Sequence, residues 1–355
     1  MIEKSLIDWK HAEQLSIAAL VAAGVPEANA QIQVNLFLEA DLRGRASHGL
    51  LRLPRVIQRI RNGVANPTTR GDATWRGDAL LHVDGQQGLG PVVAFAALER
   101  IAVRAKTTGV AVAAISNNNH LGMLAVYAER IAEQGQILLA LTTSEALVHP
   151  WGGRTAMVGT NPVAIGVPAS PSPFVLDMAT GLVSMGQIHD YANRGQALEP
   201  GWALDAQGEP TLDAAAAKAG AIAPFGGAKG YALGLSFEIL VAALTASAMG
   251  KDVVGTLDAV NPCNKGDVFI VIEPASGSMS TLVSAYLDAL RASAPSEPHR
   301  PVSVPGDRAQ AQRIRSLERG IEIAPEVWRE ICSLAGQPNS ARVPLNPDTS
   351  ADFKK

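Results

Sequence analysis

The sequence has little cysteine, with only Cys263 and Cys332 in a chain of 355 residues. Two cysteines cannot form a disulfide framework or a cysteine-based zinc site. The seven histidines are scattered, and no two are spaced four residues apart, as two metal ligands on one helix face would be. No metal site is therefore predicted.

An excess of charge of one sign is also missing. The chain carries 30 Lys and Arg against 33 Asp and Glu, a formal net charge of −3 at pH 7. This balance provides no bulk attraction for nucleic acid or for anionic lipid. With 47% hydrophobic residues, the composition is that of an ordinary globular protein. We predict no nucleic-acid and no membrane partner.

The N-terminus lacks the apolar core of a signal peptide, because charged residues interrupt MIEKSLIDWKHAEQL. A cytoplasmic location is expected. One stretch, residues 231–250, is long and apolar enough to raise the question of a membrane span. It contains Glu238 and many small residues, and we interpret it as a buried core helix.

Helical patterns occupy both ends of the chain, residues 1–75 and 301–355, and the second segment is predicted to return to the first. Asp8 can cap the first helix and Pro26 lies in the first turn of the second. Between them, residues 76–300 alternate strands and helices, which argues for an α/β domain. The expected elements are 50–62, 79–83, 91–106, 110–115, 121–134, 137–142, 229–247, 268–273, 308–319 and 325–334.

No G-x-G-x-x-G fingerprint follows a strand. The nearest approach, residues 85–90 (GQQGLG), has the wrong spacing and no acidic residue at the usual distance for a ribose. We interpret it as a turn. A dinucleotide would therefore need a site other than the Rossmann one.

Among the residues that are present, His120 stands out. It lies in SNNNHLGM (116–123), after the apolar run 109–115 and before a helical pattern. Ligands of α/β proteins bind beyond the carboxyl ends of strands, and imidazole titrates near neutral pH, so His120 is a candidate acid or base. The alternative is that Asn119 or Ser116 merely caps the helix and that His120 is a surface residue.

A second candidate site opens the long apolar helix. In residues 226–230 (GGAKG), the N–H groups of the helix start and the Lys229 ammonium would face the same point, which suits a phosphate. The alternative is an ordinary glycine-rich helix start with a solvated lysine.

Arg52 is a candidate for binding a carboxylate, because a guanidinium can form two parallel hydrogen bonds with it. It lies four residues after His48, so both would face one pocket if a helix extends back that far. The alternative is a solvated charge among the neighbouring arginines, which are Arg43, Arg45, Arg55, Arg59 and Arg61.

Seven blocks make the chain similar to the type-2 malate/L-lactate dehydrogenases, a family that also includes ureidoglycolate, sulfolactate and diketogulonate oxidoreductases and piperideine-2-carboxylate reductases. NNNHLGM (117–123) resembles the SNHFG-type signature of that family. The other blocks are DLRGRASHGLLR (41–52), PWGG (150–153), GTNP (159–162), LDMAT (176–180), GWALDAQGEPTLD (201–213) and GGAKGYAL (226–233).

The resemblance implies an NAD(P)-dependent oxidoreductase that interconverts a small 2-hydroxy acid, such as lactate, malate, sulfolactate or ureidoglycolate, and its 2-keto acid. It also implies an α/β fold with a non-Rossmann NAD(P) site on a largely antiparallel mixed sheet, a helical lobe from the two terminal segments, and a homodimer. His120 would be the acid or base, Arg52 would anchor the carboxylate, and His48 with Ser47 would position the substrate or the imidazole. The positions that match cofactor contacts are Ser144, Asp177, Met178, Ala179, Lys229, Gly230, Gly306 and Asp307.

Two other functions stay open. A reductase of cyclic imines, such as piperideine-2-carboxylate or pyrroline-2-carboxylate, would use the same pocket with nitrogen in place of oxygen. A catalytically silent ligand-binding protein could keep the fold, although the candidate acid, anion and phosphate sites together argue against it. Leu121 stands where Phe is common in the family, Val56 where an aromatic residue is common and Gln187 where Lys is usual, and these departures bear on the substrate.

Overall fold

The computed structural model describes residues 5–274 and 279–337. The chain forms two compact units, one made of the residues up to Gln58 together with those from Ala309 onward, and the other made of Arg59–Arg308. These boundaries differ from the expected ones near residues 75 and 300. At the start of the second unit, the Arg59 guanidinium donates to Asn119 Oδ1 and to the carbonyl oxygen of Asp258.

The first unit consists mainly of helices from both ends of the chain. Its elements are β1 (Ser5–Ile7), α1 (Trp9–Ala22), α2 (Glu27–Leu42), the 3₁₀ helices η1 (Ala46–His48) and η2 (Leu50–Arg52), most of α3 (Leu53–Arg61), most of α10 (Asp307–Arg319), β14 (Ile321–Ile323) and α11 (Pro325–Leu334). Asp8 caps α1 by accepting a 2.9 Å hydrogen bond from the His11 N–H. Two 2.8 Å hydrogen bonds from Arg313 of α10 to Glu39 of α2 tie the C-terminal helices to the N-terminal ones. Residues 338–355 of the expected C-terminal segment lie outside the described residues.

The second unit is built on a seven-stranded mixed sheet. Its strands, in spatial order, are β2 (Asp72–Arg76), β3 (Leu80–Gly88), β4 (Val110–Asn118), β13 (Asp267–Ile272), β5 (Ile137–Thr142), β8 (Val163–Val167) and β9 (Phe174–Met178). Strands β3 and β4 are parallel, and every other neighbouring pair in this sheet is antiparallel. The expected mixed α/β architecture is therefore present.

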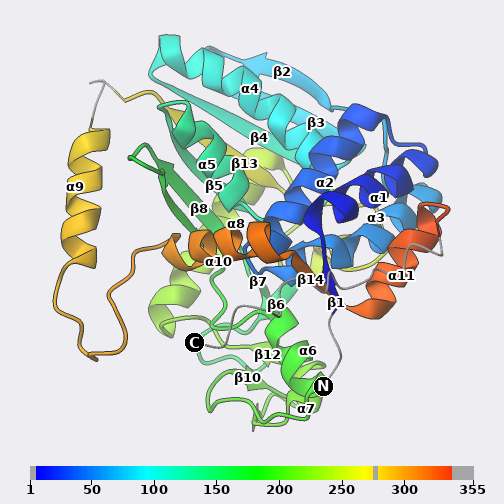
Figure 1. Ribbon diagram of the computed structural model, residues 1–355, viewed down its shortest axis with the longest axis vertical. Coiled ribbons are helices and arrows are strands. Elements are labelled where there is room, and N and C mark those ends of the chain that lie inside the picture. Colours follow the sequence, from blue (N-terminus) through cyan, green and yellow to red (C-terminus); the bar gives the residue numbers. More distant parts are fainter. Residues whose placement is uncertain (1–4, 275–278, 338–355) are drawn as a thin grey trace, which may run out of the picture. The chain divides into compact units, whose positions relative to one another are not determined.

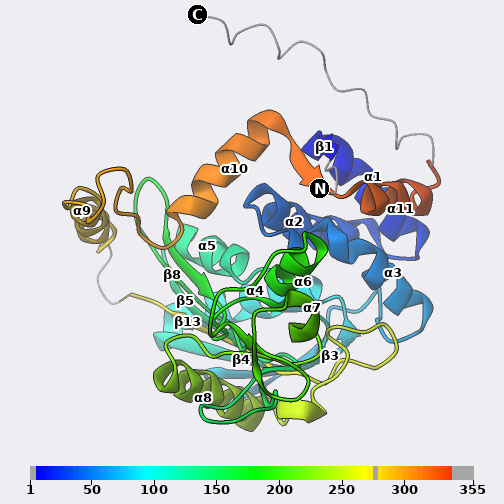
Figure 2. The same ribbon diagram turned by 90° about the horizontal axis from the view of Figure 1, so that it is seen from below.

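Helices cover both faces of this sheet. Helices α4 (Gly90–Thr108) and α5 (Ala125–Glu133) lie on one face and α8 (Ala228–Thr245) lies on the other (Figure 1, Figure 2). A second sheet has the strand order β11-β10-β12-β6-β7. The remaining elements are β6 (Ala146–Val148), β7 (Val158–Gly159), α6 (Met185–Asn193), β10 (Ala203–Leu204), β11 (Pro210–Thr211), α7 (Ala214–Ala217), β12 (Ala221–Ile222), η3 (Gly250–Asp252) and α9 (Ser280–Arg291).

Helix α8 is the apolar stretch that was expected to be a buried core helix. It is the one helix of the described residues that is long and apolar enough to cross a membrane. One face packs on the sheet, where Val241 belongs to an apolar cluster with Leu141 and Val268. Only 33% of the helix is buried, however, and Ile239 and Leu240 on it are exposed. The expectation is therefore correct for one face of the helix only.

The GQQGLG segment is a bulged strand end rather than a simple turn. Strand β3 continues through Gly88 with a shifted register, and Gln86 and Gln87 have positive φ. Gly90 then starts α4 directly against His120, because a Cβ on Gly90 would lie 2.2 Å from the His120 carbonyl oxygen. The segment thus allows α4 to approach the candidate acid/base residue.

Candidate active site

His120 lies half-buried between β4 and α5. Its Nδ1 accepts a 3.0 Å hydrogen bond from the backbone N–H of Gly122. Gly122 has a φ of 78°, a left-handed conformation that glycine adopts without steric cost. Because Nδ1 accepts a hydrogen bond, the neutral ring carries its proton on Nε2.

The polar residues before His120 are held by the sheet and do not cap the following helix. The N-cap of α5 is Leu124, whose side chain makes no capping hydrogen bond. The Asn119 amide donates to two backbone carbonyls at the end of β3, at 2.7 and 2.9 Å, and accepts a 2.9 Å bond from Arg59. Ser116 lies inside β4. The interpretation in which Asn119 or Ser116 caps the helix is therefore wrong.

Asp177 connects β9 to the helix that follows His120. Its Oδ2 accepts a 2.7 Å hydrogen bond from the N–H of Ala125, the first residue of α5. A carboxylate is favourable at this position because it meets an otherwise unsatisfied N–H and the positive end of the helix dipole. Met178 ends β9 and packs into the apolar cluster beside α8, and Ala179 follows it. The sequence did not show this structural role of Asp177.

Ser144 follows β5 in a loop that α8 supports. Its Oγ accepts a 2.9 Å hydrogen bond from the Thr160 N–H, and its own N–H donates to Asn161 Oδ1 at 3.3 Å. Asn161 is fully buried and donates a 2.6 Å bond to Glu238 Oε2 on α8. Glu238, which in the sequence is only a polar interruption of an apolar stretch, therefore braces the loop that carries Ser144.

Lys229 is exposed in the first turn of α8. The helix starts after Gly226 and Gly227, which have φ values of 59° and 65°. A Cβ on Gly230 would lie 1.7 Å from the Phe225 carbonyl oxygen, so only glycine fits there. This end of α8 combines unsatisfied N–H groups with an exposed ammonium group, and it has the chemistry that a phosphate requires.

The Gly306–Asp307 element lies against β9. Gly306 has a φ of 97°, and a Cβ on it would lie 3.2 Å from the Val175 carbonyl oxygen. Asp307 accepts hydrogen bonds of 3.1 and 2.8 Å from Nε and Nη2 of Arg291. This pairing with Arg291 lowers the pKa of the Asp307 carboxyl. Asp307 is therefore already fixed by a bidentate ion pair.

In the first unit the structure brings Ser47, His48 and Arg52 together. Ser47 Oγ lies 3.0 Å from His48 Nδ1, and Arg52 Nε donates a 2.7 Å hydrogen bond to the Ser47 carbonyl oxygen. Burial lowers the pKa of His48 to about 4, and the positive charges of Arg52 and Arg45 act in the same direction. His48 is therefore neutral at pH 7. The helix does not extend back to His48, because the extended backbone of Gly49 separates η1 from η2.

Asp41 is a residue whose importance the sequence did not reveal beyond its place in the DLRGRASHGLLR block. Its buried carboxylate accepts a 2.8 Å hydrogen bond from the Leu50 N–H. A Cβ on Gly49 would lie 2.0 Å from Asp41 Oδ1, so the turn sits directly on this carboxylate. Burial raises the pKa of Asp41 to about 7, and the hydrogen bond from Leu50 opposes part of that rise.

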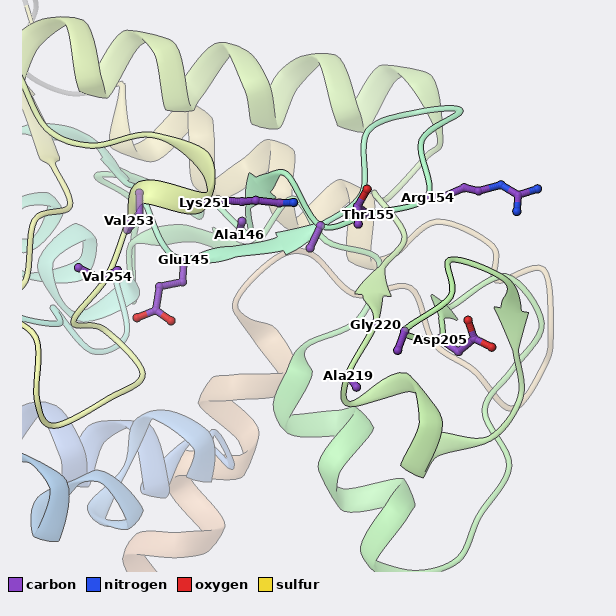
Figure 3. Close-up of a pocket in the computed structure, with 12 residues that line it drawn as sticks. Glu145, Ala146, Arg154, Thr155, Asp205, Ala219, Gly220, Lys251, Val253 and Val254 are labelled. Atoms are coloured by element: carbon purple, nitrogen blue, oxygen red, sulfur yellow. The ribbon is translucent and has the colours of Figure 1, made fainter.

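A polar pocket of about 410 Å³ is lined in part by Glu145 and Ala146, which follow Ser144 in the sequence (Figure 3). Glu145 and Lys251 lie on one side of it, and Asp205 lies on the other. Glu145 Oε1 accepts three hydrogen bonds of 2.8 to 3.0 Å from Thr256 and its neighbour, which fix this wall. None of the predicted site residues lines the pocket. Among the described residues, no three His, Cys, Asp or Glu side chains are grouped to hold a metal ion.

Comparison with known proteins gives the family of this α/β chain. The sequence model of the malate/L-lactate dehydrogenase family matches residues 7–332, and the chain belongs to that family. It is 35% identical over 331 residues to L-sulfolactate dehydrogenase of Methanocaldococcus jannaschii, covering 91% of this chain and 95% of that protein. It is 33% identical over 318 residues to a Δ1-pyrroline-2-carboxylate reductase of Ancylobacter novellus, covering 89% and 93%.

A solved structure agrees with this assignment. The crystal structure of a dehydrogenase from Sinorhizobium meliloti matches with a TM-score of 0.91 and 51% identity, over 94% of this chain and 99% of that one. Other relatives are named as dehydrogenases of malate and sulfolactate, one of them with NADP(+) as its cofactor. The chain is therefore an NAD(P)-dependent oxidoreductase.

Proposed function

We propose that the protein interconverts a small 2-hydroxy acid and its 2-keto acid, and that His120 exchanges the proton at the substrate oxygen. The observation that carries this proposal is the hydrogen bond from Gly122 to His120 Nδ1, because it orients the imidazole in the resting protein. Lactate, malate, sulfolactate and ureidoglycolate all belong to the substrate class.

The direction of the reaction decides what His120 must do. When bound, the nicotinamide cofactor would supply hydride-transfer chemistry at C2 of the substrate. In the reduction the substrate oxygen needs a proton, which a protonated His120 can donate from Nε2, leaving a neutral ring, at a typical gain of about 10²- to 10⁴-fold in rate. In the oxidation Nε2 of the neutral ring accepts the proton. In both directions the reacting ring carries a proton on Nδ1, so the hydrogen bond from Gly122 must open during turnover.

Arg52 is proposed to bind the substrate carboxylate, as the family resemblance implies. Because its Nε is engaged by the Ser47 carbonyl, a bidentate grip would use the two Nη atoms. His48 is neutral at pH 7, and with Ser47 it can position a polar group without adding charge.

The cofactor is proposed to bind outside any Rossmann fingerprint. Support comes from the bulged GQQGLG segment and from the phosphate chemistry at the start of α8. The proposed contacts are Ser144, Asp177, Met178, Ala179, Lys229, Gly230, Gly306 and Asp307. A homodimer and a cytoplasmic location are proposed on the family resemblance alone, and sedimentation analysis tests the first of these.

The second candidate is a cyclic-imine reductase, which the relative named Δ1-pyrroline-2-carboxylate reductase favours. A panel of substrates distinguishes the keto-acid reductase from the cyclic-imine reductase. Pyruvate, oxaloacetate, 3-sulfopyruvate, Δ1-pyrroline-2-carboxylate and Δ1-piperideine-2-carboxylate are mixed with NADH or NADPH, and the absorbance of the reduced nicotinamide is followed. We expect the highest kcat/KM with a keto acid. Turnover of the imines alone would select the second candidate, and turnover of no member would contradict both.

A further inference from the structure

A buried polar cluster lies where one end of each of three neighbouring central strands, β4, β13 and β5, comes together. Asp267, the first residue of β13, and Asn118, the last residue of β4, are both fully buried. Asp267 Oδ2 accepts a 3.0 Å hydrogen bond from Asn118 Nδ2, and its Oδ1 accepts bonds from Thr142 Oγ1 and Lys265 Nζ. Lys265 is 2% exposed, so the cluster holds a complete ion pair removed from water.

Stability alone explains this cluster poorly. Removing two charges from water is costly, and apolar side chains of similar volume are often as stable or more stable in such a position. Beside Asp267 in the sheet, Ile115 opposite it on β4 and Val268 after it are apolar and buried, whereas Thr142 opposite it on β5 is polar. A charged pair kept in these surroundings points to a specific orienting role.

The cluster is connected to His120 through the backbone that follows Asn118. Asn118 precedes His120 by two residues, and the neighbouring Asn117 has a φ of 50°, a conformation that needs support from its surroundings. Asn118 Oδ1 is buried and has no hydrogen-bond partner among the described residues. The bond to Asp267 is therefore what orients the Asn118 amide.

We propose that Asp267 is a positioning residue for the proton transfer at His120. Through Asn118 it fixes the end of β4 from which the His120 segment leaves, and Lys265 is its buried counter-ion. The inference rests on the proposed role of His120, since Asp267 and Asn118 act through that residue.

The other end of β13 offers a matched control. Gln136 is buried, and its Nε2 donates a 2.7 Å hydrogen bond to Glu273, which directly follows β13. Its Oε1 also has no hydrogen-bond partner among the described residues. Gln136 therefore matches Asn118 in burial and in its bond to a carboxylate, but it precedes β5 and does not lead into the His120 segment.

The test compares Asn118→Ala with Gln136→Ala for kcat, for cofactor Kd by fluorescence titration and for Tm. Displacing a catalytic group by about 1 Å can cost about 100-fold in rate. We therefore expect Asn118→Ala to lower kcat by about 10- to 100-fold at unchanged cofactor Kd, while Gln136→Ala loses thermal stability but keeps wild-type kcat. Equal effects on kcat, or a wild-type kcat in Asn118→Ala, would overturn the proposal.

The His120→Ala background separates this proposal from the proposed function. If Asn118 acts through His120, adding Asn118→Ala to His120→Ala causes little further loss of kcat, because residues that act as a unit are not additive. Additive losses contradict the positioning role, whereas wild-type turnover by His120→Ala alone contradicts the proposed function. If Asn118→Ala does not fold, Asn118→Ser, which keeps a side-chain donor, takes its place in both comparisons. The expected changes in kcat have the same direction.

Discussion

The backbone N–H of Gly122 donates a 3.0 Å hydrogen bond to Nδ1 of His120. The bond spans two residues, so the orientation of the candidate acid depends on the local backbone. That backbone has a φ of 78° at Gly122, where a residue with a side chain would be strained.

Gly122→Ala is expected to reduce kcat by about 10-fold or more, because strain at this residue misdirects the imidazole. Gly135→Ala is the control, since Gly135 also has a positive φ, of 84°, and a Cβ there meets nothing within 4 Å. Both variants should lose about 1 kcal/mol of stability. Steady-state kinetics and thermal melts of both variants measure the changes in kcat and in stability. Equal kcat values in the two variants would show that the hydrogen bond from Gly122 to His120 does not contribute to catalysis.

Lys229→Ala is expected to weaken cofactor binding by about 10-fold or more, the usual worth of a charge-assisted hydrogen bond. The keto-acid KM at saturating cofactor should change little, because a phosphate contact is the same in the ground and transition states. Fluorescence titration measures the Kd. Lys251→Ala is the comparison, and if it weakens binding while Lys229→Ala does not, the phosphate belongs in the pocket of Figure 3.

Arg52→Lys keeps the charge but loses the planar fork, and we expect a loss of about 10- to 100-fold in kcat/KM. The loss should be much smaller for a substrate analogue with a neutral amide in place of the carboxylate. Arg55→Lys is the matched control, because Arg55 is an exposed arginine three residues further on. Equal losses for acid and amide, or equal effects at the two arginines, would show that another group holds the carboxylate.

The raised pKa of Asp41 predicts a pH-dependent stability. The native protein holds a proton at Asp41 up to about pH 7, whereas an unfolded Asp loses it near pH 4. The contribution of Asp41 to the free energy of unfolding therefore falls as the pH rises from about 4 to 7. Asp41→Asn lacks this titration, so its stability relative to wild type should rise over that range by up to about 4 kcal/mol, at about 1.4 kcal/mol per pH unit.

Urea unfolding of both proteins at several pH values measures this difference, and a difference independent of pH contradicts the assignment. For His48→Gln, the free energy of unfolding relative to wild type should change with pH in the opposite direction. The pKa of His48 is lowered to about 4 in the native state, while an unfolded His titrates near pH 6.5. The native protein therefore binds fewer protons between these values, and the contribution of His48 to stability grows as the pH rises.

Local elements of the fold were predictable from the sequence. Strand β5 and helix α11 have the expected bounds, because apolar periodicity and a Pro at a helix start act within a few residues. Strand β1 was missed, because its three residues are ordered by pairing with β14 near the other end of the chain. The insertion of β13 between β4 and β5 was likewise outside the reach of local patterns.

The candidate site was predictable to a similar degree. Motif spacing located His120, but the sequence could not show that Asp41, Glu238 and Asp267 are buried carboxylates behind the site loops. Burial of a charge depends on partners that are distant in sequence, such as Asn161 for Glu238. Whether the helix would extend back to His48 could not be predicted, because the conformation of a single residue, Gly49, decides it.

The most direct test of the proposed mechanism is the kcat of His120→Ala for keto-acid reduction at saturating cofactor. We expect a loss of about 10²- to 10⁴-fold, the usual contribution of a general acid. The cofactor Kd and the Tm should stay near wild type, because the side chain of His120 is only half-buried. Turnover within a few fold of wild type would show that another group supplies the proton and would contradict the account of this site.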